Sequence, residues 1–241
     1  MRAIVMNAIG GPEVLQPADV PEPTPAAGEV LVEIEAVGVN FAETEKRRGV
    51  YRAPPLPYIL GREAAGVVVA AGSGVDLALV GARVAYFAPG ASGSYAELAT
   101  VPASALFRFE TELPFDRMAA LPEQGLTAHG VLGLAAMRPG QTALVLAAAG
   151  GVGQILVQLA RRAGARVLGV VSTPAKREPV AALGAEVITG YDGFAEAARA
   201  LTGGRGVDVV FDSVGRATQV ASFAALARRG QLIYYGDASG L

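Results

Sequence analysis

The stretch Leu146-Ala147-Ala148-Ala149-Gly150-Gly151-Val152-Gly153 sets the architecture of the C-terminal half of this chain. The apolar run over residues 143–149 is typical of a strand that is buried on both faces. After the glycines, apolar residues recur at helical spacing from Val152 to Ala163. A buried strand, a glycine turn and a helix in this order predict a dinucleotide-binding turn.

The glycines of such a turn have separate physical tasks. One lets the backbone approach a pyrophosphate, and another lets the new helix pack closely on the strand it has left. The helix N-terminus adds free N–H groups and a partial positive charge. Gly150 and Gly153 match the second and third glycines of G-x-G-x-x-G, while Ala148 stands at the first. We therefore expect the phosphates to be bound by Ala149, Gly150, Gly151, Val152 and Gly153; a glycine-rich loop without a ligand is the alternative.

The end of the next predicted strand, residues 166–171, indicates which cofactor binds. An NAD-preferring site usually has an acidic residue there, about twenty residues past the turn, to bind the ribose 2′-hydroxyl. This chain has none. Ser172 and Thr173 instead offer hydroxyls, and Lys176 and Arg177 offer cations, which suits a 2′-phosphate and hence NADP(H). The alternative is that Lys176 and Arg177 form a solvated first helical turn.

Composition narrows the function classes. The 241 residues are 52% hydrophobic and 17% charged, as expected of a globular chain. A formal net charge of −2 argues against nucleic acid and anionic membranes as partners. Zero cysteines exclude disulfides and thiolate chemistry, and one histidine makes a histidine-built metal site implausible. The short apolar run at residues 1–6 does not resemble a secretory signal, so we expect a cytoplasmic protein.

The pattern of apolar segments changes along the chain, and this change predicts domains over residues 1–122 and 123–241. The first part has short apolar segments between Pro and Gly clusters, which predicts a curled or barrel-like sheet, with helices over 41–48 and 116–136 and a break near Gly125. After residue 140, alternating strands and helices predict a parallel sheet. The strands are expected at 143–148, 166–171, 186–189, 207–212 and 231–235. The helices are expected at 152–163, 175–183, 193–202 and 217–228, with C-terminal glycine caps at Gly164, Gly184, Gly203 and Gly230.

Five predicted parallel strands are one fewer than a full doubly wound dinucleotide fold contains. The chain ends directly after the fifth strand. Either the protein has a smaller sheet or the sequence is truncated at its C-terminus, and we expect truncation.

Five motifs in order carry a family resemblance: 37–44 (VGVNFAET), 61–66 (GREAAG), 125–128 (GLTA), 147–153 (AAAGGVG) and 212–215 (DSVG). Together they resemble the zinc-independent quinone oxidoreductases, the ζ-crystallin-like branch of the medium-chain dehydrogenase/reductases. In zinc-dependent relatives a Cys lies near the position of Asn40 and a His precedes the Glu of the second motif. Here Arg62 takes the place of that His.

The resemblance implies an α/β chain with an N-terminal GroES-like β-barrel catalytic domain and a Rossmann-type doubly wound parallel sheet. It also implies that a C-terminal return and a sixth strand are missing, and that the full-length form is a homodimer. The implied reaction is metal-independent reduction of a quinone or an α,β-unsaturated carbonyl, a small-molecule substrate, by hydride transfer from NADPH. An enoyl-thioester reductase of polyketide type and an NADPH-binding protein without turnover remain alternatives.

The same resemblance assigns roles to single residues. Asn40 and Tyr51 are the catalytic candidates, as hydrogen-bonding groups near the nicotinamide; a turn-capping asparagine and a packed loop aromatic are the alternatives. Thr127 matches a position near the nicotinamide, and Tyr191 matches a tyrosine near the adenosine phosphate. At the carboxyl ends of the last two strands, Ser213 and Val214 are expected beside the nicotinamide and Gly236 is expected to give backbone room.

Overall fold

A computed structural model describes residues 1–51, 55–88, 93–109 and 112–240 of the chain. It divides into two compact units, an N-terminal unit over residues 1–123 and a C-terminal unit over residues 124–241. The boundary falls inside α3 (Pro122–Ala135). Each unit is described by itself.

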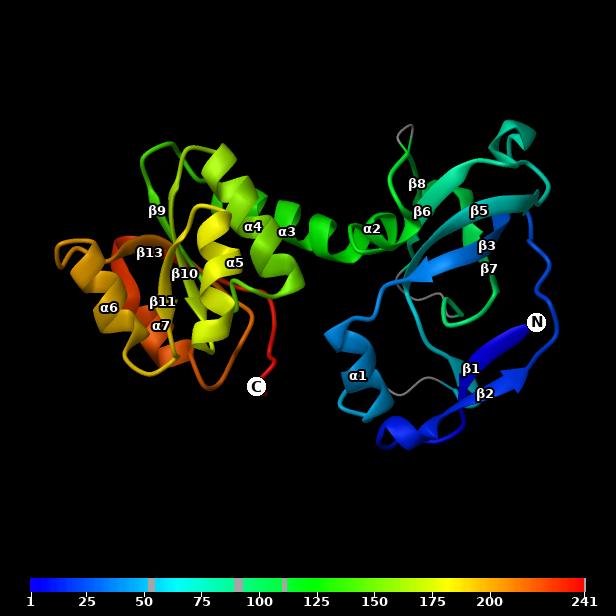
Figure 1. Ribbon diagram of the computed structural model, residues 1–241, viewed down its shortest axis with the longest axis horizontal. Helices are drawn as coiled ribbons and strands as arrows, with labels where there is room; N and C mark the ends of the chain where they lie inside the picture. The colour runs from blue at the N-terminus through cyan, green and yellow to red at the C-terminus, as the bar shows by residue number, and fades with distance from the viewer. Residues whose placement is uncertain (52–54, 89–92, 110–111, 241) are drawn as a thin grey trace. The chain divides into compact units, whose positions relative to one another are not determined.

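The N-terminal unit is built from antiparallel strands (Figure 1). Its larger sheet has the order β7-β3-β5-β6-β8, and a second sheet has the order β2-β1-β4. The expectation of a β-rich N-terminal domain is confirmed. The strands are β1 (Arg2–Met6), β2 (Leu15–Asp19), β3 (Glu29–Val37), β4 (Tyr58–Ile59), β5 (Glu63–Ala71), β6 (Arg83–Phe87), β7 (Leu98–Pro102) and β8 (Leu106–Arg108), with 3-10 turns η1 (Pro12–Val14), η2 (Leu77–Leu79) and η3 (Ala103–Ala105).

Alternation along the strands builds the core of this unit. Val30 and Val32 of β3 pack with Val84 and Tyr86 of β6 in one buried cluster. The opposite face of the sheet packs against α2 (Phe115–Ala119), where Met118 is fully buried. The polar cluster described below lies where β5 begins and α1 (Phe41–Arg47) starts.

The helices of this unit confirm one prediction and correct another. The helix expected over 41–48 is α1. The helix expected over 116–136 is two helices, α2 and α3, and the break lies at residues 120–121 and not at Gly125. Pro122 opens α3, because proline suits the first turn of a helix and cannot continue the preceding one. Gly125 stays helical.

The C-terminal unit contains a five-stranded parallel sheet in the order β11-β10-β9-β12-β13. This is the order of a Rossmann-type sheet with five strands, as the alternating pattern predicts. The strands are β9 (Thr142–Val145), β10 (Arg166–Val171), β11 (Glu186–Thr189), β12 (Val207–Asp212) and β13 (Leu226–Tyr234); the helices are α4 (Gly151–Arg162), α5 (Arg177–Ala182), α6 (Phe194–Leu201) and α7 (Gln219–Ala225), with a 3-10 turn η4 (Pro174–Lys176) before α5.

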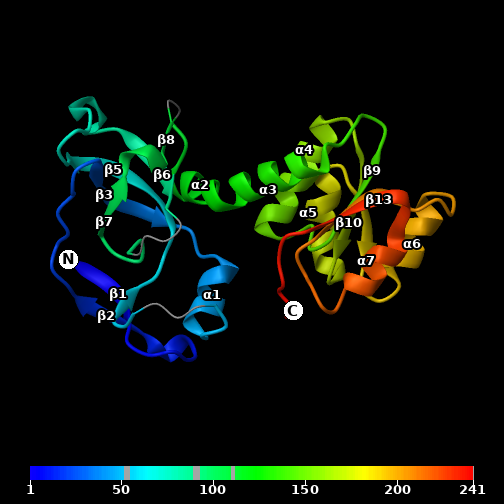
Figure 2. The same ribbon diagram turned by 180° about the vertical axis from the view of Figure 1, so that it is seen from behind.

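The parallel sheet is covered on both faces (Figure 2). Val145 of β9 faces Leu156 of α4 in one buried cluster, and Leu144 of the same strand faces Phe194 of α6 in the other. Burial on both faces explains why this strand is an unbroken apolar run and not an alternating one. The doubly wound arrangement is confirmed.

The last helix and strand differ from the prediction. Helix α7 ends at Ala225, and β13 begins at Leu226, which pairs with Val207 before a register shift. Gly230 therefore lies inside β13 and is no helix cap, whereas Gly164, Gly184 and Gly203 adopt the positive φ expected of caps. The bulge uses Arg229 at φ 65° for its left-handed residue. Sequence periodicity missed this strand start because the bulge interrupts it.

Candidate functional site

The glycine turn of the C-terminal unit is tied to both neighbouring strands. The N–H of Leu146 donates to the carbonyl of Phe211 on β12 at 3.0 Å, and the N–H of Ala148 donates to the carbonyl of Val170 on β10 at 3.0 Å. Ala147 between them adopts a left-handed conformation at φ 48°. The turn therefore sits where the strand order reverses, which is where open α/β sheets bind their ligands.

Gly150 and Gly153 meet different surroundings. A Cβ at Gly153 would overlap the carbonyl oxygen of Ala147 and lie 2.8 Å from the Cα of Ala148, so no side chain fits there without moving α4. Gly150 is the N-cap of α4 and is exposed, and a Cβ there would meet only the carbonyl oxygen of Ala147, at 3.1 Å. One glycine closes the packing of helix on turn, and the other leaves the helix N-terminus open, as a pyrophosphate site requires. Ala149, Gly151 and Val152 complete this turn.

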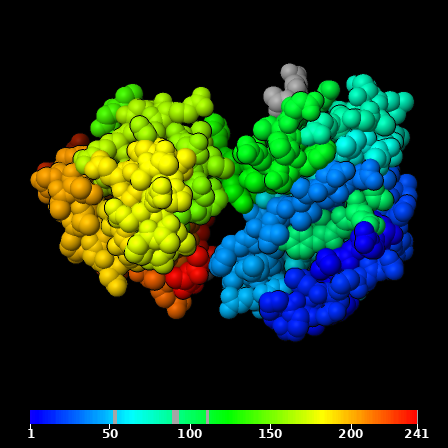
Figure 3. Space-filling view, in the orientation of Figure 1, coloured from blue at the N-terminus to red at the C-terminus, as the bar shows by residue number. Residues whose placement is uncertain are grey.

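The segment after β10 brings two of its four polar candidates together. The Nζ of Lys176 lies 3.1 Å from the Oγ of Ser172, and both residues are exposed. Thr173, at the N-cap of η4, is also exposed. Arg177 instead donates to the carbonyl of Val187 at 3.0 Å and to the Oγ1 of Thr189 at 2.7 Å, which joins α5 to the end of β11. Figure 3 shows the region around residue 180, in yellow, at the surface of this unit.

Asp212 organises the turn after β12, and sequence analysis gave it no role. Its carboxylate is fully buried and accepts from the N–H groups of Val214 at 2.8 Å and Gly215 at 3.2 Å. The hydroxyls of Thr218 and Ser222 donate to it at 2.8 and 2.7 Å. An aspartate that ends a buried apolar strand, with hydroxyl residues six and ten positions later, was the available signal.

Tyr191 lies at the glycine turn. Its phenol oxygen accepts a hydrogen bond from the N–H of Ala147, and burial together with the charge of Asp212 raises its pKa. The side-chain hydroxyl of Ser213 donates to the phenol oxygen of Tyr235, and burial raises the pKa of Tyr235 as well. A Cβ at Gly236 would lie 3.0 Å from the carbonyl oxygen of Ser213, so the chain after β13 packs closely on this residue.

The remaining candidates of this unit occupy two elements. Val214 is half-buried in the turn after β12 and packs against the buried cluster that contains Leu144 and Phe194. Thr127 is half-buried within α3, beside the fully buried Ala128. The turn, Tyr191, Ser213 and Gly236 thus gather around the carboxyl ends of β9 and β12, and Ser172 and Lys176 follow the end of β10.

In the N-terminal unit, Asn40 is the N-cap of α1 and is buried. It forms a capping box with Glu43, whose carboxylate accepts from the N–H of Asn40 at 2.7 Å. Its side-chain Nδ2 donates to the Oε1 of Glu63 at 2.7 Å. The capping role kept open above is therefore present, and the amide is also held from a second side.

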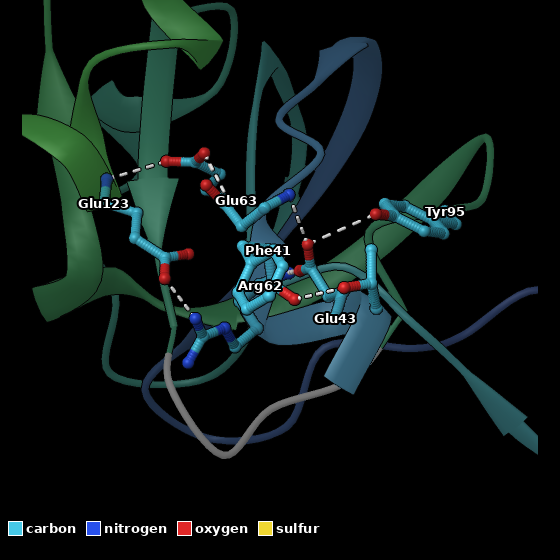
Figure 4. Close-up of polar contacts among 8 residues, drawn as sticks. Phe41, Glu43, Arg62, Glu63, Tyr95 and Glu123 are labelled. Atoms are coloured by element: carbon cyan, nitrogen blue, oxygen red, sulfur yellow. Dashed lines mark hydrogen bonds and ion pairs between the residues drawn. The ribbon is translucent and has the colours of Figure 1, made fainter. Parts of the chain in front are cut away.

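Glu63 is the centre of this cluster, and no role was predicted for it. It is fully buried at the start of β5, and its Oε2 accepts from the backbone N–H of Glu123 at 2.7 Å (Figure 4). Burial raises its pKa, and the hydrogen bonds from Asn40 and Glu123 oppose that shift. A charged residue that opens the apolar strand Glu63–Ala71 was the signal for it.

Arg62, Glu123 and Tyr95 complete the cluster. The Arg62 guanidinium pairs with the Glu123 carboxylate, and its backbone N–H donates to Glu43 at 3.0 Å. The Tyr95 hydroxyl donates to Glu43 at 3.2 Å. Burial raises the pKa of Glu123 to about 7, against the lowering effect of Arg62, and the carboxylates of Glu63 and Glu43 raise it further. The cluster therefore holds three carboxylates against one guanidinium.

Tyr51 lies four residues after α1 and is 38% exposed. Its backbone N–H lies 3.5 Å from the carbonyl oxygen of Glu45.

Across the described part of the chain, no three His, Cys, Asp or Glu residues are grouped so that they could hold a metal ion. None of the helices described there is long and apolar enough to cross a membrane.

Comparison with known proteins shows which family the chain belongs to. Residues 26–111 match the model of the alcohol dehydrogenase GroES-like domain, and residues 151–240 match that of the zinc-binding dehydrogenases. Quinone oxidoreductase 1 of Escherichia coli is 39% identical over 234 residues, which cover 96% of this chain and 71% of that protein. The chain belongs to the quinone oxidoreductases of the medium-chain dehydrogenase/reductase superfamily.

Further relatives are similar to this chain in sequence and in structure. The solved Escherichia coli quinone oxidoreductase complexed with NADPH superposes with a TM-score of 0.94 at 38% identity, over 100% of this chain and 74% of that one. The 2-haloacrylate reductase of a Burkholderia species is 39% identical over 249 residues, with 99% of this chain and 74% of that protein covered. Close structural relatives of this quinone oxidoreductase chain are thus known with NADPH bound.

The raised pKa of Glu123 predicts a pH-dependent stability of this quinone oxidoreductase chain. Because the folded state holds this proton more tightly than the unfolded state, where the pKa is near 4.5, the contribution is full below that value and is lost as the pH rises through about 7. Glu63, whose pKa is also raised, acts with the same sign. We expect the free energy of unfolding to fall by about 1–3 kcal/mol between about pH 5 and 8, and Glu123→Gln to flatten this slope.

Urea unfolding at several pH values measures this effect. Glu35→Gln, at an exposed carboxylate of β3, is the matched control. If Glu123→Gln keeps the wild-type slope while Glu35→Gln does the same, Glu123 does not carry the proton and the prediction fails.

Proposed function

We propose that this chain carries out metal-independent reduction of quinones or α,β-unsaturated carbonyls with NADPH. The observation that carries the proposal is the turn closed by Gly153, with the Ser172 and Lys176 pair after the next strand. The open helix N-terminus at Gly150 fits a pyrophosphate, and a hydroxyl beside an ammonium group fits a 2′-phosphate. NADPH, when bound, supplies the hydride.

The chain's own residues position the cofactor. The backbone of Ala149, Gly150, Gly151, Val152 and Gly153 holds the pyrophosphate, and Ser172, Thr173 and Lys176 hold the 2′-phosphate. Arg177 contributes by fixing the first turn of α5 to β11, through its bonds to Val187 and Thr189. Thr127, Ser213, Val214 and Gly236 lie on the nicotinamide side, and Tyr191 lies at the adenosine side of the phosphates.

Asn40 and Tyr51 provide the polar groups of the reaction. A hydrogen bond from the Asn40 amide to the acceptor oxygen stabilises the negative charge that hydride addition creates there. In this proposal the Tyr51 hydroxyl donates a second hydrogen bond or a proton. Most of the catalysis then comes from positioning and electrostatics.

Two relatives frame the substrate class. Quinone oxidoreductase 1 supports a quinone, and the 2-haloacrylate reductase supports an α,β-unsaturated acid or carbonyl. In both classes the hydride enters a conjugated system whose oxygen gains charge, so the same donors serve both. An enoyl thioester reductase of polyketide type is the alternative that extends this class.

An assay with NADPH and a panel of quinones, enones, 2-haloacrylates and enoyl thioesters tests the proposal, with a binding titration of NADPH run beside it. We expect NADPH oxidation with at least one quinone or enone. Binding of NADPH without turnover of any acceptor would overturn the enzymatic proposal in favour of a binding protein.

The 2′-phosphate role of Lys176 gives a separate prediction. Lys176→Ala removes one charge-assisted hydrogen bond to the phosphate, so we expect the dissociation constant for NADPH to rise about tenfold or more. NADH has no 2′-phosphate and should lose less than about threefold. Isothermal titration with both cofactors measures the two constants.

Arg162→Ala is the matched control, because Arg162 is an exposed cation in the last turn of α4. It changes the net charge equally and should leave both constants within about twofold. Equal losses for NADPH and NADH in Lys176→Ala would refute the 2′-phosphate role.

A further inference from the structure

Glu63 connects Asn40, at the start of α1, to Glu123, at the start of α3. Its two oxygens have different partners: Oε1 accepts from the Asn40 side chain, and Oε2 accepts from the Glu123 backbone. The partners are 23 and 60 residues away in sequence. One fully buried carboxylate therefore joins two helix starts and the first residue of β5 (Figure 4).

The two hydrogen-bond partners of Glu63 favour a carboxylate over any other side-chain group of the same size. Both partners donate, and an ionised carboxylate only accepts. A glutamine has one oxygen and one NH2 group, so it would satisfy one partner and turn a donor toward the other. An unmatched buried donor costs free energy, which makes the site selective for Glu63.

The surroundings leave Glu63 and Asn40 little freedom. A Cβ at Gly38 would overlap the Glu63 carboxylate, so the glycine makes room for that side chain. On its other side Asn40 is held by the capping box with Glu43, and Glu43 is held in turn by Arg62 and Tyr95. The side-chain amide of Asn40 is thus held by the Glu63 carboxylate, which accepts from Nδ2, and by the backbone N–H of Glu43, which donates to the Asn40 side chain in the capping box.

We propose that Glu63 is a positioning residue for the reaction, because it fixes the direction in which the Asn40 amide nitrogen faces. This rests on the proposed function, in which the Asn40 amide contacts the acceptor oxygen. An asparagine amide can turn over and exchange its nitrogen and oxygen at little cost when its surroundings are neutral. A carboxylate that accepts from Nδ2 removes the turned-over state, since it would then face the amide oxygen with a negative charge. In this role Glu63 acts on the reaction only through Asn40.

Glu63→Gln, which keeps the size of the side chain, tests the positioning. We expect kcat with the best acceptor to fall about tenfold or more, because the amide loses its single orientation. The dissociation constant of NADPH should stay within about threefold, since the phosphate contacts proposed above lie in the C-terminal unit. Glu63→Asp keeps both accepting oxygens and should recover part of kcat. Glu33→Gln, at an exposed carboxylate of β3, is the control and should leave kcat unchanged.

A double variant tests the pairing without any assay of activity. In Glu63→Gln combined with Asn40→Asp, the glutamine NH2 can donate to the new carboxylate while its oxygen accepts from the N–H of Glu123. The urea midpoint of the double variant should therefore lie closer to wild type than that of Glu63→Gln alone, although kcat stays low because the Asn40 amide is gone.

The outcomes separate this proposal from the proposed function. A folded Glu63→Gln variant with wild-type kcat, or additive losses of midpoint in the double variant, would overturn the positioning role. A wild-type chain that binds NADPH and turns over no acceptor would overturn the proposed function and this role in the reaction with it. The midpoints would in that case still decide whether the Asn40 and Glu63 pairing exists.

Discussion

Gly153→Ala should destabilise the C-terminal unit by about 3 kcal/mol and remove measurable NADPH binding. The added Cβ would overlap the carbonyl oxygen of Ala147 and approach the Cα of Ala148 to 2.8 Å, and both neighbours are backbone of the turn. Overpacking of this kind cannot be relieved by rotating a side chain, so α4 must shift off the turn. That shift moves the N–H groups that we propose to hold the pyrophosphate. Urea unfolding and an NADPH titration measure the two effects.

Two other glycines provide controls with the same chemical change. Gly150→Ala meets one atom at 3.1 Å, so it should keep most of the stability while the methyl group obstructs the pyrophosphate. Gly133 lies on an exposed part of α3, and a Cβ there meets nothing within 4 Å. Gly133→Ala should stabilise the chain by up to about 1 kcal/mol through helix propensity. A Gly153→Ala variant as stable as Gly133→Ala would disprove the close packing of α4 on the turn.

Asp212→Ala should cost about 3–5 kcal/mol, the largest stability effect that we expect in this chain. The carboxylate is fully buried, and two backbone N–H groups and two hydroxyls donate to it. Removal of the acceptor leaves the Ser222 hydroxyl and the N–H groups of Val214 and Gly215 without this partner, while the Thr218 hydroxyl keeps its contact with the carbonyl of Gly215. Buried donors that lose their acceptor cost more than the bond itself contributes. The turn that carries Ser213 and Val214 should lose its fixed conformation together with the stability.

Urea unfolding of three variants tests whether the loss of stability comes from the hydrogen bonds to the Asp212 carboxylate. Asp192→Asn, at an exposed aspartate of the same unit, should change the free energy of unfolding by less than about 0.5 kcal/mol. Ser222→Ala removes one donor of the set and should cost about 1 kcal/mol, because the carboxylate keeps its other partners. If Asp212→Ala were as mild as Asp192→Asn, the network around Asp212 would not hold the turn.

The fold of the C-terminal unit could be predicted closely because its signals are local. The apolar run before Gly150, the helical spacing after it and the glycine caps at Gly164 and Gly184 each act within a few residues. The prediction was wrong where a non-local pairing decides: Val207 pairs with Leu226, and this starts β13 earlier than its periodicity indicates. Pro122 was a local signal that the expected break at Gly125 overlooked.

The candidate site was predictable only in part. Asn40 was found as a motif residue, and the structure places it at a helix cap that is also held by Glu63. Glu63 and Glu123 received no roles, because their contact joins residues 60 positions apart and leaves no periodic trace. Lys176 and Arg177 are adjacent cations, and the sequence alone does not distinguish their roles. Their tertiary contacts do: Lys176 lies beside Ser172, whereas Arg177 is hydrogen-bonded to β11.

We propose that this chain has a dinucleotide site that selects the 2′-phosphate. Parallel titrations of the 241-residue chain with NADPH and with NADH at the same ionic strength test it directly. We predict that NADPH binds at least about tenfold more tightly, because one or more charge-assisted hydrogen bonds reach only its 2′-phosphate. Equal affinities, or tighter binding of NADH, would contradict the account.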